Sequence, residues 1–380
     1  MKILLFGGSF DPPHHGHRVV LQAALRRVRP DRACVIPSFG SPLKAGPRTE
    51  ARCRWDMARK LFRPVISAHP EVRLDALELR RRRIGFTYQT LRHFRQKYPS
   101  AEIWFLLGSD AALGLRRWKR PKELYRLAHW LVAKRPEVPF PRMDCAPFAL
   151  LPVRPPPWSS TEIRTRLLTG DDTRGMIPAG VRDYIRRRRL YGLKIHRKLR
   201  VVLPPKRYRH TLGVTRLAAA LARRHGLDAE AAALAGLLHD CGRRFTPAQM
   251  VRYARRHRLR VPYRAAIERR APLLLHAFIS AHLARTSFGV KDDRVLGAVE
   301  NHTLGRAGMP PLDRLLYVAD AASEDRDFKE ASVIRKLAMK NLGRAFRAAV
   351  EAKIRYVRSQ GYWMHPGTRT LLRWAKRISP

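Results

Sequence analysis

The fold of the first half is decided by the stretch Leu4-Leu5-Phe6-Gly7-Gly8-Ser9-Phe10-Asp11-Pro12-Pro13-His14-His15-Gly16-His17. The apolar run 2–6 predicts a buried strand that ends at the two glycines. From about residue 17 to 29 apolar residues recur at helical spacing, so a helix follows the turn. This order directs backbone N–H groups and the positive end of a helix at one point, which suits a phosphate. His14 and His17, three residues apart, can donate hydrogen bonds to phosphate oxygens there.

This stretch resembles the signature of the nucleotidylyltransferase superfamily, and within it the bacterial nicotinate-mononucleotide adenylyltransferases. The family usually has Thr where this chain has Ser9. The resemblance implies that the loop binds ATP and that the two histidines are catalytic. The residues concerned are Gly7, Gly8, Ser9 and Phe10 for ATP, and His14 and His17 for catalysis.

Composition is that of a globular protein with two domains, because 380 residues suffice for two separate cores. No run of about 18 apolar residues exists, so no membrane span is expected. The apolar segment 2–6 is too short for a signal peptide. Four cysteines without paired spacing favour a reducing cytoplasm and argue against a structural zinc site; they are Cys34, Cys53, Cys145 and Cys241.

The net charge of +48 has two interpretations. One is attraction to polyanions such as nucleotides or RNA. The other is a genome-wide preference for arginine spread over solvated surfaces, which is favoured because the clusters at 80–83 and 186–189 lack interleaved aromatic residues. Nonspecific RNA binding is compatible with both.

Strands and helices alternate through the rest of the first half. Strands are expected at 33–37, 72–74, 102–107 and 130–133, and a helix at 50–62. The alternation predicts an α/β domain with a Rossmann-like parallel sheet, the nucleotidylyltransferase fold, whose ligands bind at the carboxyl ends of the strands. The resemblance covers about residues 1–192, which we take as the first domain.

The resemblance also implies further site residues. Lys44 would reach the nucleotide phosphates, although Leu43 replaces the His of the family's Pro-His-Lys. The stretch from Trp158 to Arg164 is similar to the family's Ile-Ser-Ser-Thr-x-Ile-Arg, which implies ATP binding by Ser159, Ser160, Thr161 and Arg164 and a catalytic role for Arg164. The acceptor would be bound by Thr87, Asp110 and Trp118.

Each of these residues also has a structural interpretation. Lys44 suits an exposed loop, Thr87 and Asp110 suit helix caps, and Trp118 suits a half-buried position. In the functional interpretation the acceptor phosphate attacks the α-phosphate of ATP in line and pyrophosphate leaves. Catalysis then consists of positioning the reactants and neutralising phosphate charge, through His14, His17, Lys44, Arg164, the helix ends and the Mg²⁺ bound with ATP.

The second half changes character after Gly192, because Ala/Leu/Arg helices replace the strands. The order of its histidines and aspartates along the chain (His, then His-Asp, then Asp) resembles that of the HD hydrolase superfamily. The run 301–309 resembles bacterial symmetrical diadenosine-tetraphosphate hydrolases with a binuclear metal centre. We take 193–380 as an all-α HD domain. The resemblance implies as metal ligands His210, His239, Asp240, His276, His302 and Asp320.

The residue types suit two metal ions. Asp240 is the natural bridge, since a carboxylate has two oxygens for two cations about 3.5–4 Å apart. Mixed imidazole and carboxylate ligands suit iron first, with manganese or cobalt as alternatives. Substrate contacts are expected from Thr211, Arg243 and Arg306. The run 321–324, Ala-Ala-Ser-Glu, departs from the more usual Tyr-Ile-Glu-Pro-like run.

Together these patterns predict a bifunctional cytoplasmic enzyme. Its first domain would transfer AMP from ATP to nicotinate mononucleotide, and its second would hydrolyse a dinucleoside polyphosphate such as diadenosine tetraphosphate. Two alternatives stay open. The acceptor could be nicotinamide mononucleotide or phosphopantetheine, and the second half could be a nucleotide-sensing or RNA-binding module. The sequence does not predict the oligomeric state.

Overall fold

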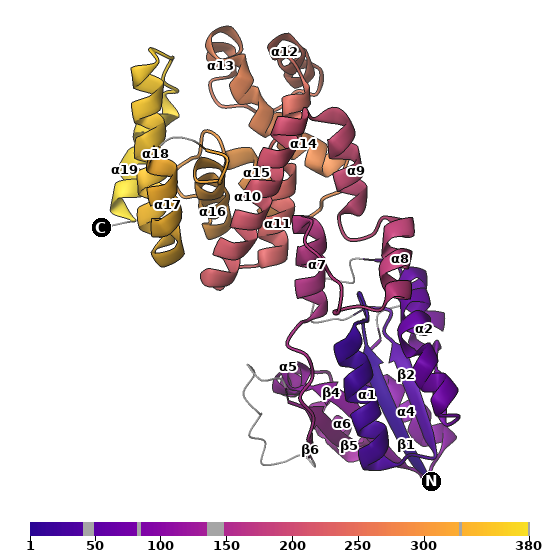
Figure 1. Ribbon diagram of the computed structural model, residues 1–380. Coiled ribbons are helices and arrows are strands. Elements are labelled where there is room, and N and C mark those ends of the chain that lie inside the picture. Colours follow the sequence, from indigo (N-terminus) through magenta and orange to yellow (C-terminus); the bar gives the residue numbers. More distant parts are fainter. Residues whose placement is uncertain (41–48, 82–84, 135–147, 327–328, 379–380) are drawn as a thin grey trace. The chain divides into compact units, whose positions relative to one another are not determined.

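The computed structural model describes residues 1–40, 49–81, 85–134, 148–326 and 329–378. It divides into two compact units. Unit 1 comprises Met1–Arg164 and Asp172–Tyr191, and unit 2 comprises Thr165–Asp171 and Gly192–Pro380. The colours of Figure 1 follow the chain through both units.

Unit 1 is built on a six-stranded parallel sheet in the order β3-β2-β1-β4-β5-β6. The strands are β1 (Lys2–Gly8), β2 (Arg32–Pro37), β3 (Val72–Leu74), β4 (Glu102–Gly108), β5 (His129–Ala133) and β6 (Phe148–Leu151). The predicted α/β class is confirmed, and β6 is a strand that the sequence did not predict. The chain builds outward from β1 on one side and from β4 on the other, so the carboxyl ends of these two neighbours form the switch point where ligands bind in such sheets.

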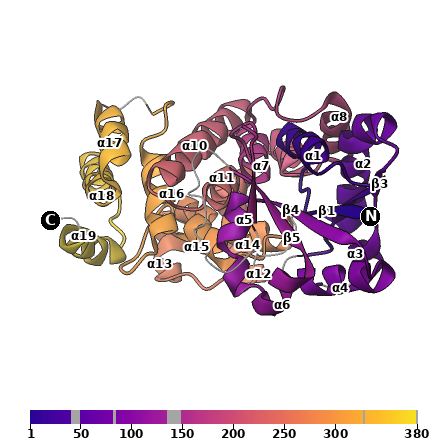
Figure 2. The same ribbon diagram turned by 90° about the horizontal axis from the view of Figure 1, so that it is seen from below.

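Helices pack on both faces of the sheet (Figures 1 and 2). The helices of this half of the chain are α1 (His15–Val28), α2 (Ala51–Ala68), α3 (Leu77–Arg80), α4 (Thr87–Lys97), α5 (Ser109–Leu113), α6 (Pro121–Leu127), α7 (Ser160–Thr169), which is divided between the units, and α8 (Ala179–Arg188). Helix α2 continues past its predicted end at residue 62 despite Pro64. Buried Leu61, Phe62 and Val65 anchor it on either side of the proline, which outweighs the lost backbone hydrogen bond.

Unit 2 is helical, as predicted. Besides short 3-10 helices it contains α9 (Leu193–Val202), α10 (Pro205–Arg224), α11 (Ala229–Leu238), α12 (Pro247–Arg256), α13 (Arg264–Arg270), α14 (His276–Thr286), α15 (Asp293–Asn301), α16 (Pro311–Ala321), α17 (Lys329–Lys340), α18 (Leu342–Ser359) and α19 (Gly367–Arg377). Helices α10 and α11 approach closely, because a Cβ at Gly236 would lie 2.8 Å from Thr215 Cα. Buried alanines such as Ala218 and Ala235 permit this distance.

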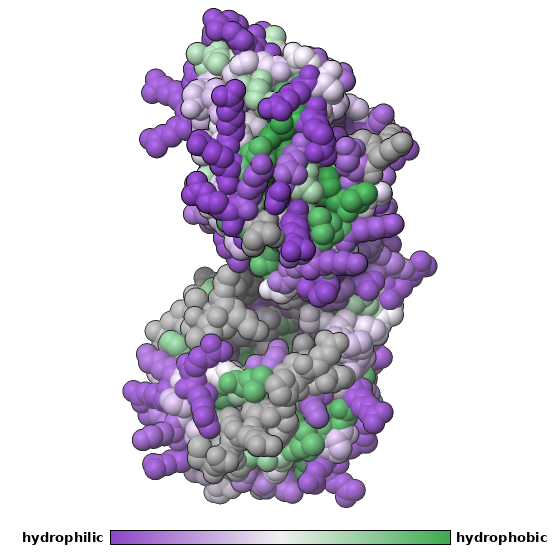
Figure 3. All heavy atoms as spheres, turned by 90° about the vertical axis from the view of Figure 1, so that its left-hand side faces the viewer, coloured by the Kyte–Doolittle hydropathy of each residue, from purple (hydrophilic) through white to green (hydrophobic). Residues whose placement is uncertain are grey.

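Hydrophilic side chains predominate among the coloured residues of the face drawn in Figure 3, with small hydrophobic areas between them. None of the helices in the described ranges combines the length and apolar character that a membrane crossing requires. The described cysteines Cys34, Cys53 and Cys241 are free thiols, and Cys145 lies outside the described residues.

Candidate functional site

A buried arginine fixes the loop that follows β1. Arg54 of α2 is 1% exposed. Its guanidinium donates hydrogen bonds to the carbonyl oxygens of Ser9 (2.9 Å), Phe39 (2.9 Å) and Thr49 (3.3 Å), and also to that of Ser38. One side chain thereby joins the segments that follow β1 and β2. Arg54 is a site residue that was not predicted from the sequence, because its partners are backbone atoms, which a side-chain motif does not specify.

The same loop is held from the end of unit 1. The Tyr191 hydroxyl donates to Asp11 Oδ1 over 2.6 Å, and the Thr49 hydroxyl donates to the same oxygen over 2.5 Å. Burial raises the pKa of Tyr191 well above its usual value, and the Asp11 charge adds to the rise. The phenol therefore stays protonated and remains a donor, which fixes Asp11 in place.

The amino-terminal end of α7 meets this loop. Arg164 Nη1 donates to the carbonyl oxygen of Asp11 over 2.7 Å, and Ser160 Oγ donates to that of Pro12 over 2.9 Å. Arg164 Nη2 also donates to Thr161 Oγ1 over 3.0 Å. Two motifs about 150 residues apart in the sequence thus form one site.

The two histidines lie side by side at the start of α1, with ring centroids 3.8 Å apart. The His14 backbone N–H donates to His17 Nδ1 over 3.1 Å. Because Nδ1 accepts, a neutral His17 carries its proton on Nε2, which is then a donor for a phosphate oxygen. A Cβ at Gly16 would lie 2.9 Å from His14 Nδ1, so only glycine leaves this imidazole where it is.

The other predicted ATP-binding residues differ in exposure. Gly7 and Gly8 end β1, and Ser9 follows them as an exposed residue. Phe10 is fully buried, and its ring packs against those of Phe6 and Phe62, so its predicted contact with ATP stays a prediction. Ser159 Oγ accepts from the Glu162 N–H and caps α7.

The predicted acceptor residues come from other elements of unit 1. Thr87 is the first residue of α4, after the capping residue Phe86. Asp110 is exposed in α5, directly beyond β4 at the switch point. Trp118 is partly buried and packs edge-on against Trp130. Their roles, like that of Lys44, which lies outside the described residues, stay predictions.

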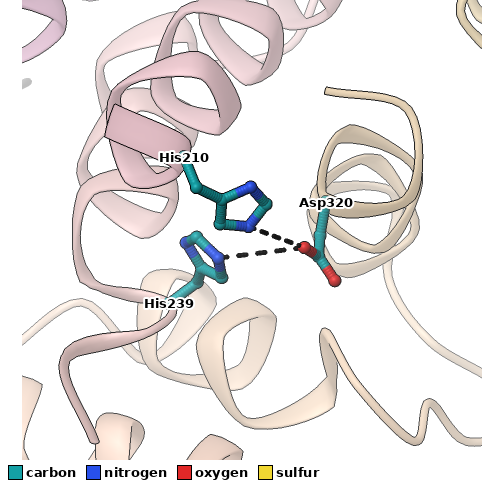
Figure 4. A group of neighbouring side chains, drawn as sticks. All are labelled: His210, His239 and Asp320. Atoms are coloured by element: carbon teal, nitrogen blue, oxygen red, sulfur yellow. Dashed lines mark hydrogen bonds and ion pairs between the residues drawn. The ribbon is translucent and has the colours of Figure 1, made fainter. Parts of the chain in front are cut away.

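In unit 2, the six predicted metal ligands gather from separate helices. Figure 4 shows His210 of α10 and His239 at the end of α11 pointing toward Asp320 of α16. His210 Nε2 lies 3.2 Å and His239 Nε2 lies 3.9 Å from Asp320 Oδ1. These three buried residues form one group that could hold a metal ion.

Asp240 joins this group to the remaining histidines. Its Oδ2 lies 3.5 Å from His239 Nε2. Its Oδ1 lies 3.3 Å from His276 Nε2 and 3.9 Å from His302 Nε2. The two carboxylate oxygens thus face different histidines, as a bridge between two cations requires.

Three of the histidines share one local geometry. His239, His276 and His302 each follow the last residue of a helix, where the carbonyls of the final turn lack intrahelical partners. Each Nδ1 lies within hydrogen-bond distance of the carbonyl oxygen three residues earlier, at 2.6–2.7 Å. A carbonyl can only accept, so Nδ1 carries the proton and Nε2 presents a lone pair.

These lone pairs converge. His276 Nε2 and His302 Nε2 are 3.1 Å apart, and the Thr303 hydroxyl near both has one proton to donate. His239 Nε2 is fully buried and finds no hydrogen-bond partner among the described residues. Buried acceptors without donors are costly, and a shared cation would satisfy them. The donor set therefore fits a pair of transition-metal ions.

The protonation states agree with this fit. Burial alone would raise the pKa of Asp240, but His239, His276 and Arg243 beside it hold that pKa well below its usual range. Burial, with a contribution from Arg243, lowers the pKa of His276 to about 3. Burial also places the pKa of His302 well below its usual value. At neutral pH the carboxylate is charged and both imidazoles are neutral, which is the form that binds metals.

Four cationic side chains lie around the two carboxylates. Sequence reasoning had singled out only one of them, Arg243. Helical spacing could have indicated Arg207, one turn before His210, whereas nothing in the sequence relates Lys353 to this centre. The distances are Arg207 Nη1–Asp240 Oδ2 3.0 Å, Arg243 Nε–Asp240 Oδ1 3.5 Å, Arg326 Nη2–Asp320 Oδ1 2.7 Å and Lys353 Nζ–Asp320 Oδ2 3.8 Å.

The other predicted substrate residues lie differently. Thr211 is fully buried, and its hydroxyl donates to the carbonyl oxygen of Arg207 over 3.0 Å. Arg306 is exposed and contacts the adjacent carbonyl of Ala307. Among the described residues, Arg243 is the one of these three that contacts a carboxylate of the cluster, and the roles of all three stay predictions.

Known proteins resemble both halves. The Cytidylyltransferase-like family model matches residues 5–166 and the HD domain model matches 207–325. A probable nicotinate-nucleotide adenylyltransferase/Ap4A hydrolase of Mycoplasma genitalium is 28% identical over 91% of this chain and 95% of its own length. A probable nicotinate-nucleotide adenylyltransferase of Gemmatimonas aurantiaca is 35% identical over 50% of this chain and 92% of its own length.

Among solved structures, a predicted HD superfamily hydrolase involved in NAD metabolism from Clostridium acetobutylicum is 31% identical, with a TM-score of 0.46. It covers 48% of this chain and 96% of its own length. The two family models thus match separate halves of the chain, and the name of the Mycoplasma protein combines an adenylyltransferase with a hydrolase. The chain belongs, through its first half, to the nicotinate-nucleotide adenylyltransferase family, and its second half is an HD domain.

Proposed function

We propose that unit 1 transfers AMP from Mg²⁺-bound ATP to nicotinate mononucleotide, giving the deamido dinucleotide precursor of NAD and pyrophosphate. The observation that carries the proposal is that Arg164 and Ser160 of α7 hydrogen-bond to the loop after β1, the loop that leads to His14. In this proposal the start of α7, the Arg164 guanidinium and the Nε2–H of His17 act together on the triphosphate of ATP. Such a cluster neutralises charge on a triphosphate without a covalent intermediate.

The acceptor comes from the relatives rather than from geometry. Those of Gemmatimonas and Mycoplasma carry nicotinate-nucleotide adenylyltransferase in their names. The partly buried Trp118 would offer an aromatic face to a pyridine ring. Nicotinamide mononucleotide and phosphopantetheine are the competing acceptors.

Pyrophosphate release with ATP and a panel of acceptors tests this proposal. We expect turnover to be fastest with nicotinate mononucleotide. Strong turnover with phosphopantetheine alone would refute the acceptor assignment. His17→Asn should lose activity, whereas His15→Asn, one of the adjacent histidines, is the matched control and should keep it.

We propose that unit 2 hydrolyses a dinucleoside polyphosphate such as diadenosine tetraphosphate. The observation that carries this proposal is the convergence of four histidines on two carboxylates. His210, His239 and Asp320 would hold one metal ion, His276 and His302 a second, and Asp240 would bridge them. When bound, such ions activate a water molecule and stabilise charge on the reacting phosphate. The four surrounding cations would bind and orient the polyphosphate chain.

Metal analysis combined with a nucleotide panel tests the second activity. We expect two equivalents of iron, manganese or cobalt per chain, and ADP as the product from diadenosine tetraphosphate. His302→Gln should abolish hydrolysis, while His257→Gln, at an exposed position of unit 2, serves as the control. A protein that binds no metal but retains nucleotide or RNA would instead be a sensing or binding module.

A further inference from the structure

The outer nitrogen of His210 faces a carboxylate. His210 Nδ1 lies 2.8 Å from Asp325 Oδ2, while its Nε2 lies 3.2 Å from Asp320 Oδ1. The imidazole is 4% exposed and the Asp325 side chain 44% exposed. An aspartate at the surface thus contacts a buried histidine of the proposed metal centre.

This contact distinguishes His210 from the other three histidines of the centre. In those, Nδ1 is held by the carbonyl of the helix turn that precedes it. His210 lies inside α10, where the carbonyls of neighbouring residues take part in the helix. An orienting partner for its Nδ1 must therefore come from elsewhere in the fold. The turn after α16 supplies one in Asp325.

We propose that Asp325 is a positioning residue of the metal centre: its carboxylate accepts the Nδ1 proton of His210 and so directs the Nε2 lone pair toward the ion. This inference rests on the proposed metal-dependent function of unit 2. Such partners fix the tautomer and the ring orientation of a metal-binding histidine and increase its basicity.

The surroundings of the contact support the assignment. Ser323 Oγ lies 3.4 Å from His210 Nδ1, so a side chain at position 323 also reaches this nitrogen. Position 323 is where the related run has Glu, and this chain has the shorter Ser. Asp325 supplies a carboxylate two residues later.

Metal affinity of the full chain tests the proposal. The dissociation constant for Mn²⁺ or Co²⁺ is measured by competition with a chelating dye for the wild type, Asp325→Ala, Asp325→Asn and the neighbouring control Glu324→Gln. We expect roughly 10- to 100-fold weaker binding in Asp325→Ala. Asp325→Asn should be intermediate, because the amide keeps an acceptor oxygen but loses the charge. Glu324→Gln should bind as the wild type does.

A rescue experiment separates positioning from a general structural role. In an Asp325→Ala background, Ser323→Glu returns a carboxylate within reach of His210 and should restore much of the lost affinity. The melting temperatures of the chelated variants should match that of the chelated wild type. Equal metal affinity of wild type and Asp325→Ala would overturn the inference. A wild type that binds no metal would instead refute the proposed function itself.

Discussion

Chelation of the bound metal should destabilise unit 2. Without metal, the Nε2 lone pairs of His276 and His302 face each other at 3.1 Å, and His239 Nε2 stays buried without a donor. Metal at 100 times its dissociation constant adds about 2.7 kcal/mol to the stability of the folded state. For a unit of this size, that amounts to a melting temperature higher by roughly 5–11 °C.

Differential scanning calorimetry of the full chain, with Mn²⁺ or with a chelator, measures this shift. His302→Gln removes one lone pair and provides an amide that can donate to His276, so its chelated form should melt no lower than the chelated wild type. Its metal-dependent shift should be clearly smaller, because the second ion would lose one of its two histidines while the first keeps His210, His239 and Asp320. The exposed His257→Gln should retain the full shift. An equal shift in His302→Gln and the wild type would refute the assignment of His302 as a ligand.

Three further outcomes follow. Arg164→Lys should lower adenylyltransferase kcat/KM roughly 10- to 150-fold, a difference of about 1.5–3 kcal/mol, because an ammonium group cannot contact both Asp11 and a phosphate as the planar guanidinium can. Pyrophosphate release measures this loss, and unchanged metal content is the control. Gly16→Ala should reduce the same activity by displacing His14, with little change in melting temperature. Chelated protein should lose stability as the pH falls below about 6.5, because His276 has a pKa of about 3 when folded but an ordinary one when unfolded; a urea midpoint no lower at pH 5.5 than at pH 7.5 would contradict this.

The element order of unit 1 was largely predictable from the sequence. Four of the five predicted strands contain continuous apolar runs bounded by turn residues, which is typical of strands buried on both faces; β3 is the short segment Val-Arg-Leu. The sixth, β6, has four residues and pairs with β5 alone at the edge of the sheet. A strand this short is defined by its pairing with β5 as much as by its own residues, so the pattern of apolar residues within the segment could not predict it.

The proposed metal centre shows the same division. The residues proposed as its ligands were predictable because histidine and aspartate at these positions resemble a known pattern. Their orientation was not, because it depends on helix ends for His239, His276 and His302 and on the distant Asp325 for His210. The carbonyls at a helix end are only three residues from the histidine in the sequence, so those contacts could in principle be predicted. The contact between His210 and Asp325 spans 115 residues and could not.

The cations around the proposed metal centre bear on its proposed substrate class. Four cations contact the two carboxylates, and two divalent ions held by Asp240 and Asp320 would take over those carboxylates. The cations would then be free to bind phosphate oxygens. Such an excess of positive charge suits a chain of several phosphates rather than a single phosphate group. The general excess of arginine can reflect composition alone, whereas the proposed recognition of a polyphosphate rests on the arrangement of these four side chains about the two aspartates.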